Sequence, residues 1–363
     1  MRNKTHKRQM KKKNILIVFG GSSGEYYVSC LSAAGIVQYA DKEKYDIYKL
    51  GITMEGEWLL TDATYKEIED GRSWINCKNN KRAIISPEKN KHAIITIGDD
   101  ELKELKIDCV FPLIHGYGGE DGKLQGLLEL SNIPFVGSSV LASANSMDKG
   151  ITRIFADICK LKRPKSMVIL KKDNIADFVK EVEASNLDYP LFVKPANAGS
   201  SVGVSKVDRH DQLEPAIKDA LLYDDKALVE EGIEGKEIKV AILERNKTAV
   251  VGELCELTVP KGEINDYDTK YVSHKSNKKI PADIDDNTAN TVKKQAIRLF
   301  NFMECKGFAR VDFFVDDDNN IYFNEINTIP GISKNSIYPL MMEKTGITYS
   351  DMISDLIESA FAK

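Results

Sequence analysis

Short apolar segments that end in glycine-rich turns recur along the first third of the chain. Residues 14–19 are almost wholly apolar and run into the glycine turn 20–24, after which residues 28–39 have the spacing of a helix. A strand, a glycine turn and a helix in this order open a doubly wound α/β unit. Residues 107–114 form a second buried strand that also ends in a glycine-rich turn. We therefore predict an N-terminal α/β domain over residues 13–148.

The remaining pattern predicts shorter elements in this domain and two further α+β units. In the first domain, strands are expected at residues 45–52, 83–85, 93–97 and 134–137, with a helix at 124–130. In the central unit, 149–237, helices are expected at residues 149–159, 175–185 and 213–222, and strands at 166–170, 191–194, 202–207 and 227–230. In the last unit, 238–363, strands are expected at residues 238–243, 248–257, 307–315 and 321–326, with helices at 287–303 and at the C-terminus.

The composition and charge are those of an ordinary soluble globular protein. The 363 residues are 42% hydrophobic and carry a net charge of −4, which gives no indication of a nucleic-acid partner. Apolar runs stay well short of the roughly 20 residues that cross a bilayer. Residues 1–12 are strongly basic and lack an apolar h-region, so we expect a disordered tail that precedes a usual start at Met10.

Cysteine spacing indicates a reducing compartment. The six cysteines are widely separated and include no CxxC pair. This spacing argues against a zinc site or a disulfide framework and favours buried, reduced thiols. The sequence therefore predicts a cytoplasmic protein.

Two apolar segments near the C-terminus carry polar residues at alternate positions. Arg310 and Asp312 lie in the segment 307–315, and Glu325 and Asn327 end the next one. Strand alternation places each pair on one face, so all four converge if the strands are antiparallel neighbours. Oxygen ligands suit Mg²⁺, and an arginine offsets charge on a transferring phosphoryl group. A buried salt-bridge cluster is the alternative, but the whole set favours a magnesium–phosphate site.

A lysine at the end of the apolar segment 191–194 precedes a loop of small residues, 195–203. Such a loop can present backbone N–H groups to phosphates. It is not a Walker A loop, because Lys194 comes before the glycines. A flexible turn would explain the loop but not a lysine in an apolar strand. Lys149 is a second candidate phosphate contact, although an isolated lysine is more often exposed.

Two weaker signals involve acidic residues near glycine turns. The acidic segment 228–237 could accept hydrogen bonds from an adenine amino group and ribose hydroxyls, or it could be a solvated turn. Glu25 follows the turn 20–24 at a helix start, where it could cap the helix or bind a substrate ammonium. That turn lacks the full GxGxxG spacing, so an NAD-dependent oxidoreductase is a much weaker interpretation.

Taken in chain order, these motifs resemble the D-alanine–D-alanine ligase family of ATP-grasp enzymes, which includes vancomycin-resistance members. The resemblance extends from residue 14 to residue 361. It rests on Gly20-Gly21 with Glu25-x-x-Val28-Ser29, His115-Gly116 with Gly119-Glu120-Asp121-Gly122, Met147-Asp148-Lys149, Gly199-Ser200-Ser201-x-Gly203, Asp266-Tyr267 with Lys270-Tyr271, Arg310-Val311-Asp312, and Asn324-Glu325-x-Asn327-x-x-Pro330-Gly331. It implies an ATP-grasp fold made of units 149–237 and 238–363, preceded by an α/β substrate domain.

The resemblance also implies roles for individual residues. The first D-alanine would lie near His115, with its ammonium held by Glu25 in a hydrogen-bonded trio with Ser200 and Tyr271. The ATP phosphates would be contacted by Lys149, Lys194 and Lys270. The adenine and ribose pocket would be formed by Glu230, Glu231, Ile233 and Glu237. Two Mg²⁺ ions, or Mn²⁺ in their place, would be held by Asp312, Glu325 and Asn327. The tetrahedral intermediate would be stabilised by Arg310 and the backbone of Gly331, and the second carboxylate would be bound by Ser336.

The reaction implied by the resemblance joins two D-alanines through a D-alanyl phosphate, for peptidoglycan precursor synthesis. An acyl phosphate hydrolyses readily, so the polar loop 260–280 would act as a lid that excludes water. Tyr271 argues against a depsipeptide product, because lactate-using relatives carry histidine there. Ile264-Asn265 and Ile337 differ from the serine-using relatives, although the segment 338–342 echoes the resistance enzymes. We predict D-alanyl-D-alanine, with D-alanyl-D-serine as the alternative product.

Two broader expectations remain. The resemblance implies a homodimer that acts on small molecules, with neither a nucleic acid nor a membrane as partner. A nucleotide-binding regulatory module that has lost catalysis is the alternative from another class. The complete set of candidate lysines and acids argues against that alternative.

Overall fold

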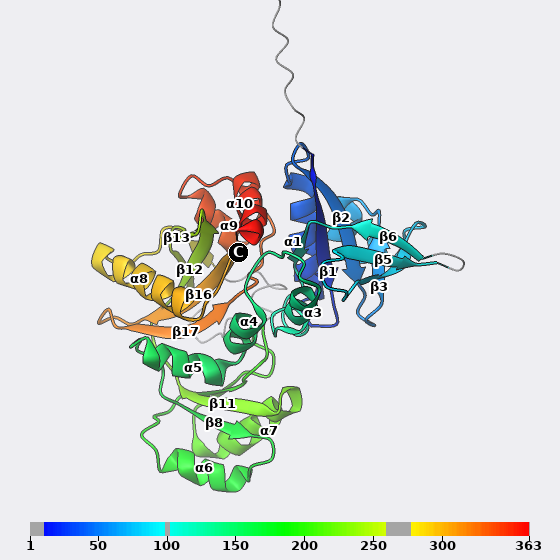
Figure 1. Cartoon of the computed structure of the whole chain (residues 1–363). Helices are drawn as coiled ribbons and strands as arrows, with labels where there is room; N and C mark the ends of the chain where they lie inside the picture. Colours follow the sequence, from blue (N-terminus) through cyan, green and yellow to red (C-terminus); the bar gives the residue numbers. More distant parts are fainter. Residues whose placement is uncertain (1–10, 99–101, 259–276, 363) are drawn as a thin grey trace, which may run out of the picture.

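The structure, a computed structural model, describes residues 11–98, 102–258 and 277–362. Within these residues the strands form three sheets of seven, four and six strands. The first and third sheets lie side by side with helix α10 (Tyr349–Phe361) between them, and the second sheet lies below (Figure 1). This mixed α/β organisation agrees with the predicted fold class.

The first sheet has a short parallel centre and a long antiparallel extension. Its central strand β1 (Lys13–Gly20) pairs in parallel with β2 (Tyr45–Ile52) and β7 (Cys109–Pro112). Beyond β2 the strands are antiparallel: β3 (Trp58–Thr61), β4 (Lys81–Ile85), β5 (Ala93–Ile97) and β6 (Leu102–Lys106). The parallel pairing of a doubly wound unit is therefore limited to three strands. The strands expected at residues 83–85 and 93–97 are present as β4 and β5, and they pair with each other. Nothing in the pattern of β6 predicts a strand, because its residues are mainly exposed and polar.

Helices and one tight turn complete the first domain. The helices are α1 (Tyr26–Tyr39), α2 (Tyr65–Glu69), the 3₁₀ helix η1 (Ser73–Asn76) and α3 (Lys123–Ser131). Gly20 ends β1 with a φ of +88°, and a Cβ there would lie 2.1 Å from the carbonyl oxygen of Ile52. Only glycine lets the chain turn this close to the neighbouring strand. The expected strand at residues 134–137 is reduced to a single bridge between Phe135 and Val110.

The second sheet is small, antiparallel and covered by helices on one face. Its order is β10-β9-β11-β8, and its members are β8 (Ser166–Leu170), β9 (Leu191–Pro195), β10 (Ser205–Val207) and β11 (Lys226–Glu231). The covering helices are α6 (Ile175–Glu183) and α7 (Leu213–Tyr223), the second preceded by the 3₁₀ helix η2 (His210–Gln212). Their apolar side chains form a core of their own that is drawn wholly from residues 167–229.

The third sheet carries the two strands with the polar alternation. Its members are β12 (Lys236–Arg245), β13 (Thr248–Val251), β14 (Cys255–Thr258), β15 (Asn277–Lys279), β16 (Phe308–Val315) and β17 (Ile321–Asn327). The single strand expected at residues 248–257 is two strands, because the chain leaves β13 at Gly252. A Cβ at Gly252 would lie only 3.1 Å from the backbone of Met341. The helices of this unit are α8 (Asp286–Phe302), α9 (Ile337–Glu343) and α10.

Two consecutive helices connect the first sheet to the second. They are α4 (Val140–Met147) and α5 (Lys149–Ile158), and both contact β17 of the third sheet. The chain breaks between them at Asp148, whose backbone is extended and whose side chain caps α5. The sequence predicts α5 but not α4, which is short and rich in serine and alanine. Among the described helices, none is both long and apolar enough to span a bilayer.

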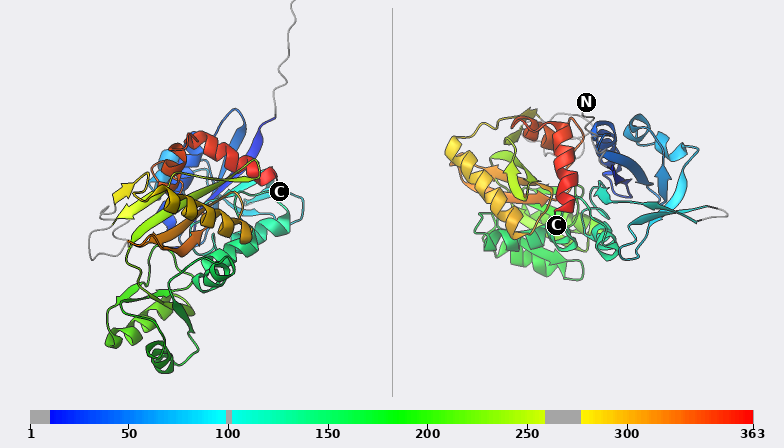
Figure 2. Two further views of the ribbon diagram at one scale, coloured as in Figure 1. Left: turned by 90° about the vertical axis from the view of Figure 1, so that its left-hand side faces the viewer. Right: turned by 45° about the horizontal axis from the view of Figure 1, so that its top comes forward.

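The first and third sheets share one apolar core across α10. Phe111 from β7 meets Phe308 from β16 with ring centroids 6.3 Å apart, and Phe308 also contacts Tyr338 of α9. The same buried cluster includes Trp74 and the apolar face of α10. In Figure 2 α10 lies between these two sheets, while the second sheet forms a separate lobe. The apolar core of the second sheet is therefore separate from the core that the first and third sheets share.

Candidate active site

Strands β16 and β17 bring the four polar residues of the C-terminal motif together. The strands are antiparallel, and their register pairs Arg310 with Asn327 and Asp312 with Glu325. The register shifts directly after Asp312. The neighbouring, antiparallel arrangement expected from the alternation is therefore confirmed, and the two carboxylates lie opposite each other.

Asp312 is fully buried between two cations. Arg310 donates to it from Nε at 2.8 Å and from Nη2 at 2.9 Å, and Lys239 of β12 donates to Oδ2 at 2.6 Å. Burial lowers the pKa of Lys239, but the carboxylates of Asp312 and Glu237, its second partner, outweigh burial and raise it. Sequence reasoning missed Lys239, although a lysine inside the apolar segment 236–243 is the same signal that singled out Lys194.

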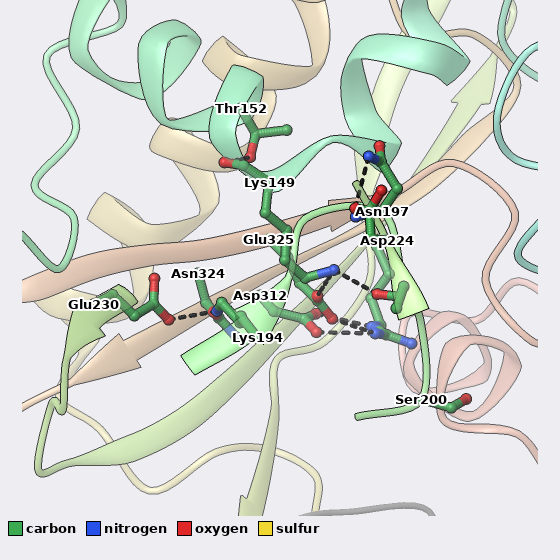
Figure 3. A network of polar contacts seen from close by, with 12 residues as sticks. Lys149, Thr152, Lys194, Asn197, Ser200, Asp224, Glu230, Asp312, Asn324 and Glu325 are labelled. Atoms are coloured by element: carbon green, nitrogen blue, oxygen red, sulfur yellow. Dashed lines mark hydrogen bonds and ion pairs between the residues drawn. The ribbon is translucent and has the colours of Figure 1, made fainter. Parts of the chain in front are cut away.

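Glu325 faces basic residues from two directions. Its carboxylate lies 3.6 Å from Arg310 and 3.8 Å from Nζ of Lys149, and a third of its side chain is exposed. Lys149 also donates to the carbonyl oxygen of Ala198 at 2.7 Å. Figure 3 shows the Lys149 side chain extending from α5 to Glu325 on β17. Lys149 is therefore part of the site and not an isolated surface lysine.

Lys194 forms a buried triad with an acid and a second cation. Its ammonium bonds to Glu230 on the neighbouring strand β11, and Glu230 also accepts a hydrogen bond of 2.6 Å from Arg153. Burial would raise the pKa of Glu230, but the charges of Lys194 and Arg153 outweigh it and hold the pKa at about 2. Burial lowers the pKa of Lys194, and the cations Arg153 and Lys149 lower it further despite Glu230. Arg153 was not among the predicted residues, because its place on the inner face of α5 emerges only from the packing.

The loop 196–203 joins this triad to the first domain. Its start is held by a hydrogen bond of 3.0 Å from the backbone N–H of Lys149 to the carbonyl oxygen of Ala196. Ser200 and Ser201 adopt φ values of +50° and +59°, which are uncommon for residues other than glycine. Strained backbone of this kind persists where the surroundings determine it, and it is concentrated at ligand sites.

Glu25 lies in a cradle of two glycines and a serine. The Ser200 hydroxyl donates to its carboxylate, although 175 positions separate the two residues in sequence. A Cβ at either Gly116 or Gly199 would lie 2.9 Å from Oε2 of Glu25. The glycines of two sequence motifs are therefore explained by close approach to one carboxylate. The third member of the expected trio, Tyr271, lies outside the described residues, as does Lys270.

Both ring nitrogens of His115 are hydrogen-bonded to the protein. Nδ1 is 2.7 Å from the carbonyl oxygen of Ile329, and Nε2 is 3.1 Å from the hydroxyl of Ser32. Burial lowers the pKa of His115, but the hydrogen bond and charge of Glu120 outweigh burial and raise it. Burial also acts on the Glu120 carboxyl group, whose pKa it raises. These two bonds therefore connect His115 to α1 and to the segment that follows β17.

Three of the predicted site residues lie at the end of β17 and in the segment that follows it. The side-chain oxygen of Asn327 accepts a hydrogen bond of 2.9 Å from the backbone of Ile329, just before Pro330-Gly331. Ser336 begins α9, and its hydroxyl lies 2.7 Å from that of Ser333. A Cβ at Gly331 would lie 3.6 Å from the Ser336 hydroxyl oxygen, so the two predicted residues are neighbours.

The candidate adenine and ribose residues lie at the end of β11, in the connection that follows, and at the start of β12. Glu231 accepts a hydrogen bond of 3.0 Å from the backbone of Lys165, and Ile233 is half-buried in the connection between the strands. Glu237 bonds to Lys239 and so lies one contact from Asp312. Acid and cation thus alternate from Glu237 through Lys239 to Asp312.

The donor set fits a metal ion that arrives with a nucleotide. Among the described residues, histidine, cysteine and acidic side chains form no group of three that could hold a metal. Both oxygens of Asp312 already bond to cations, whereas Glu325 is partly exposed. Two opposed carboxylates and an amide match the few protein ligands that Mg²⁺ takes beside phosphate oxygens. The surrounding lysines and arginines supply the charge that those phosphates need.

Family models match both halves of the chain, and the two models describe parts of one enzyme family. The family model described as D-ala D-ala ligase N-terminus matches residues 14–138, and the one described as D-ala D-ala ligase C-terminus matches residues 160–358. A D-alanine–D-alanine ligase of Caldicellulosiruptor bescii is 42% identical, covering 98% of this chain and 96% of the relative. Another from Oceanobacillus iheyensis is also 42% identical, covering 97% and 96%.

Solved structures share the fold as well as the sequence. The VanG D-Ala:D-Ser ligase from Enterococcus faecalis superposes with a TM-score of 0.87 at 37% identity, covering 96% of this chain and all of the other. The D-alanine–D-alanine ligase from Coxiella burnetii gives a TM-score of 0.84 at 30% identity, covering 97% and 94%. Together with the site described above, these matches show that the chain belongs to the D-alanine–D-alanine ligase family and is a ligase with the ATP-grasp fold.

Proposed function

We propose that this enzyme joins two D-alanines to D-alanyl-D-alanine at the cost of one ATP, for peptidoglycan precursor synthesis. The observation that carries the proposal is the opposed pair Asp312 and Glu325, flanked by Arg310 and faced by Lys149. Phosphoryl transfer to a carboxylate needs this combination of metal ligands and cations near the transferring group. The 42% identity to relatives named D-alanine–D-alanine ligases supports the choice of substrate.

The residues of the first domain would hold the first D-alanine. Its ammonium would pair with Glu25, whose carboxylate the Ser200 hydroxyl already orients. Its carboxylate would then face Arg310 and the nucleotide. We assign Tyr271 and the loop 260–280 to the closure of this pocket, since an acyl phosphate must be kept from water.

The chemistry proceeds in two balanced steps. The carboxylate oxygen of the first D-alanine attacks the γ-phosphorus of ATP, which forms an acyl phosphate and releases ADP. The amine of the second D-alanine then adds to the acyl carbon, and the tetrahedral intermediate expels phosphate as the amine loses a proton. Arg310 and the backbone N–H of Gly331 would stabilise the oxyanion, and Ser336 would bind the second carboxylate.

Nucleotide and metal would be bound by the residues that join the second and third sheets. Lys149, Lys194 and Lys270 would contact the phosphates, and Glu230, Glu231, Ile233 and Glu237 would line the adenine and ribose pocket. Asp312, Glu325 and Asn327 would hold two Mg²⁺ ions, which Mn²⁺ could replace. Bound there, the ions would neutralise charge on the phosphate oxygens.

We further infer the division of the chain and its setting. Domain boundaries are proposed at residues 148/149, between α4 and α5, and at residues 237/238, near the start of β12. The six unpaired cysteines support a cytoplasmic location. Exposed apolar residues on α3 and α4, Leu130 and Leu141, are consistent with a homodimer, which sedimentation analysis would test.

Phosphate release tests the substrate assignment directly. D-alanine alone should support turnover, and added D-serine or D-lactate should not increase it. A product containing D-serine would instead favour the D-alanine–D-serine ligase activity, for which the 37% identity to the VanG enzyme is the supporting observation. Absence of turnover with D-alanine alone would contradict the proposal. A role in vancomycin resistance would then be tested by expression in a susceptible bacterium.

A further inference from the structure

The segment Ile329 to Ile332 is held at three points by side chains from distant parts of the chain. His115 bonds to the carbonyl oxygen of Ile329 at 2.7 Å. The Ser32 hydroxyl of α1 accepts a hydrogen bond of 3.3 Å from the N–H of Ile332. The Tyr349 hydroxyl of α10 donates to the carbonyl oxygen of Ile332 at 2.6 Å. All five residues are at least 95% buried, so each bond lies away from water.

The directions of these hydrogen bonds form one consistent chain. A carbonyl oxygen can only accept, so Nδ1 of His115 carries the proton shared with Ile329. The Ser32 hydroxyl accepts a hydrogen bond from the Ile332 N–H and can donate one to Nε2 of His115, 3.1 Å away. A second proton on the imidazole would reverse the Ser32–His115 bond without breaking it, because a hydroxyl oxygen also accepts. One imidazole and one hydroxyl thus connect both ends of the segment.

The clamped peptides flank the peptide that carries the Gly331 N–H. Pro330 fixes one backbone rotation, and the bonds to Ile329 and Ile332 restrain the peptides on either side. The helix α1 leaves room for the Tyr349 hydroxyl, which bonds to Ile332, because a Cβ at Gly35 would lie 2.3 Å from it. Ser32 and Gly35 lie one turn apart on the same helix face.

We propose that Ser32 and Tyr349 are positioning residues that aim the Gly331 N–H at the oxyanion of the tetrahedral intermediate. The proposal rests on the ligase activity proposed above, in which Gly331 is an oxyanion donor. Both side chains are buried, and each hydroxyl bonds to the backbone of Ile332. Donors of this kind stabilise a transition state only when they are already oriented, so a loosened peptide should slow the reaction without weakening substrate binding.

Variants that each lack one of the two hydroxyls test whether the bonds to Ile332 position the Gly331 N–H. Tyr349→Phe and Ser32→Ala should each lower kcat about tenfold to a hundredfold, while the KM values for ATP and D-alanine stay near those of the wild type. Tyr338→Phe is the matched control, because its buried hydroxyl also donates to a backbone carbonyl, that of Ile242, at 2.7 Å. That variant should lose comparable stability and keep the wild-type kcat.

Binding of an inert mimic separates positioning from general damage. A dipeptide phosphinate copies the tetrahedral intermediate, so its affinity should fall by the same factor as kcat in Tyr349→Phe and Ser32→Ala. Affinity for ADP should not change. The double variant should lose less than the product of the single losses, because both hydroxyls hold one residue. Equal kcat values in Tyr349→Phe and Tyr338→Phe, or unaltered phosphinate affinity, would overturn the proposal. A wild-type enzyme that forms no D-alanyl-D-alanine would instead overturn the proposed function.

Discussion

Buried positive charge sets the environment of Lys194. Its side chain is 10% exposed, and it shares the single acid Glu230 with the guanidinium of Arg153. The acid is held in its charged form, whereas burial and the neighbouring cations disfavour the charged form of the lysine. An excess of buried cations is costly alone and becomes favourable when an anion binds. At this scale the site is prepared for a polyphosphate.

The lowered pKa of Lys194 predicts how nucleotide affinity depends on pH. Bound phosphates favour the ammonium form, so binding above the pKa of the free enzyme must take up a proton. The affinity for ADP should therefore fall as pH rises, by up to about tenfold per unit, starting below the usual range of a lysine. Lys194→Arg keeps its charge throughout and should show a shallower fall. Calorimetric titration without metal ions measures both dependences.

A lysine elsewhere in the same sheet provides the control. Lys206 of β10 is exposed and pairs with Asp208, so Lys206→Arg should follow the wild-type curve. A wild-type affinity that stays constant into the alkaline range would contradict the prediction. An equally steep fall in Lys194→Arg would show that another group titrates.

At the level of elements, the start of α5 combines a helix cap, Asp148, with a residue of the site, Lys149. Asp148 caps the helix by accepting a hydrogen bond of 3.1 Å from the N–H of Ile151, and it also pairs with Lys226 of β11. Lys149, the next residue, reaches Glu325 and the loop 196–203. Asp148 therefore both caps the helix and orients Lys149, the residue that follows it.

Removal of this cap should cost stability and nucleotide affinity together. Asp148→Ala should lower the free energy of unfolding by about 1–2 kcal/mol, since an N-cap contributes about 1 kcal/mol and a half-buried ion pair adds to it. Its affinity for ADP should fall about fivefold, or about 1 kcal/mol. Asp148→Asn keeps the cap and should lose less of both. Urea denaturation and ADP titration give the two quantities.

A remote cap separates the two effects. Thr64 caps α2 with a capping box, far from Lys149, so Thr64→Ala should lose comparable stability and keep its ADP affinity. Equal loss of ADP affinity in Thr64→Ala and Asp148→Ala would mean that the helix start has no special role.

Elements could be predicted where the hydrophobic pattern is strong and local. β16 and β17 are apolar runs with polar residues at alternate positions, so their type follows from the sequence. Their polar side chains converge because the two strands pair as antiparallel neighbours. The strand β6 and the helix α4 could not be predicted, because their stability comes from neighbours and not from their own pattern. Lys239 could have been found, since a lysine among six buried strand residues must have a partner.

The whole molecule places its site along a boundary between separate cores. The first and third sheets share apolar side chains, whereas the core of the second sheet is its own. Polar contacts cross the boundary instead, including Ser200 to Glu25 and Arg153 to Glu230. These partners are 175 and 77 positions apart, so no local pattern reveals them. The family resemblance pointed to Glu25 and Ser200, and Arg153 required the structure.

A ligand that fills this boundary should stabilise the molecule as a whole, and the metal part of that effect should depend on Glu325. At a hundredfold excess over its dissociation constant, a ligand adds about 2.7 kcal/mol to the free energy of unfolding. ADP with Mg²⁺ should therefore raise the melting temperature of the wild type more than ADP alone. Glu325→Gln keeps the shape of the side chain but loses its charge. It should respond to ADP and lose the additional response to Mg²⁺, together with turnover.

Glu256→Gln is the matched control for this measurement. Glu256 is a buried acid of the same sheet, and it pairs in register with Ile238, whose side chain points away from Asp312 and Lys239. That variant should therefore keep the response to Mg²⁺. An identical response in Glu325→Gln and the wild type would refute the metal assignment while leaving the fold and the family intact. Loss of the ADP response itself would instead mean that Glu325 acts on the nucleotide through Lys149, since the two side chains face each other at 3.8 Å.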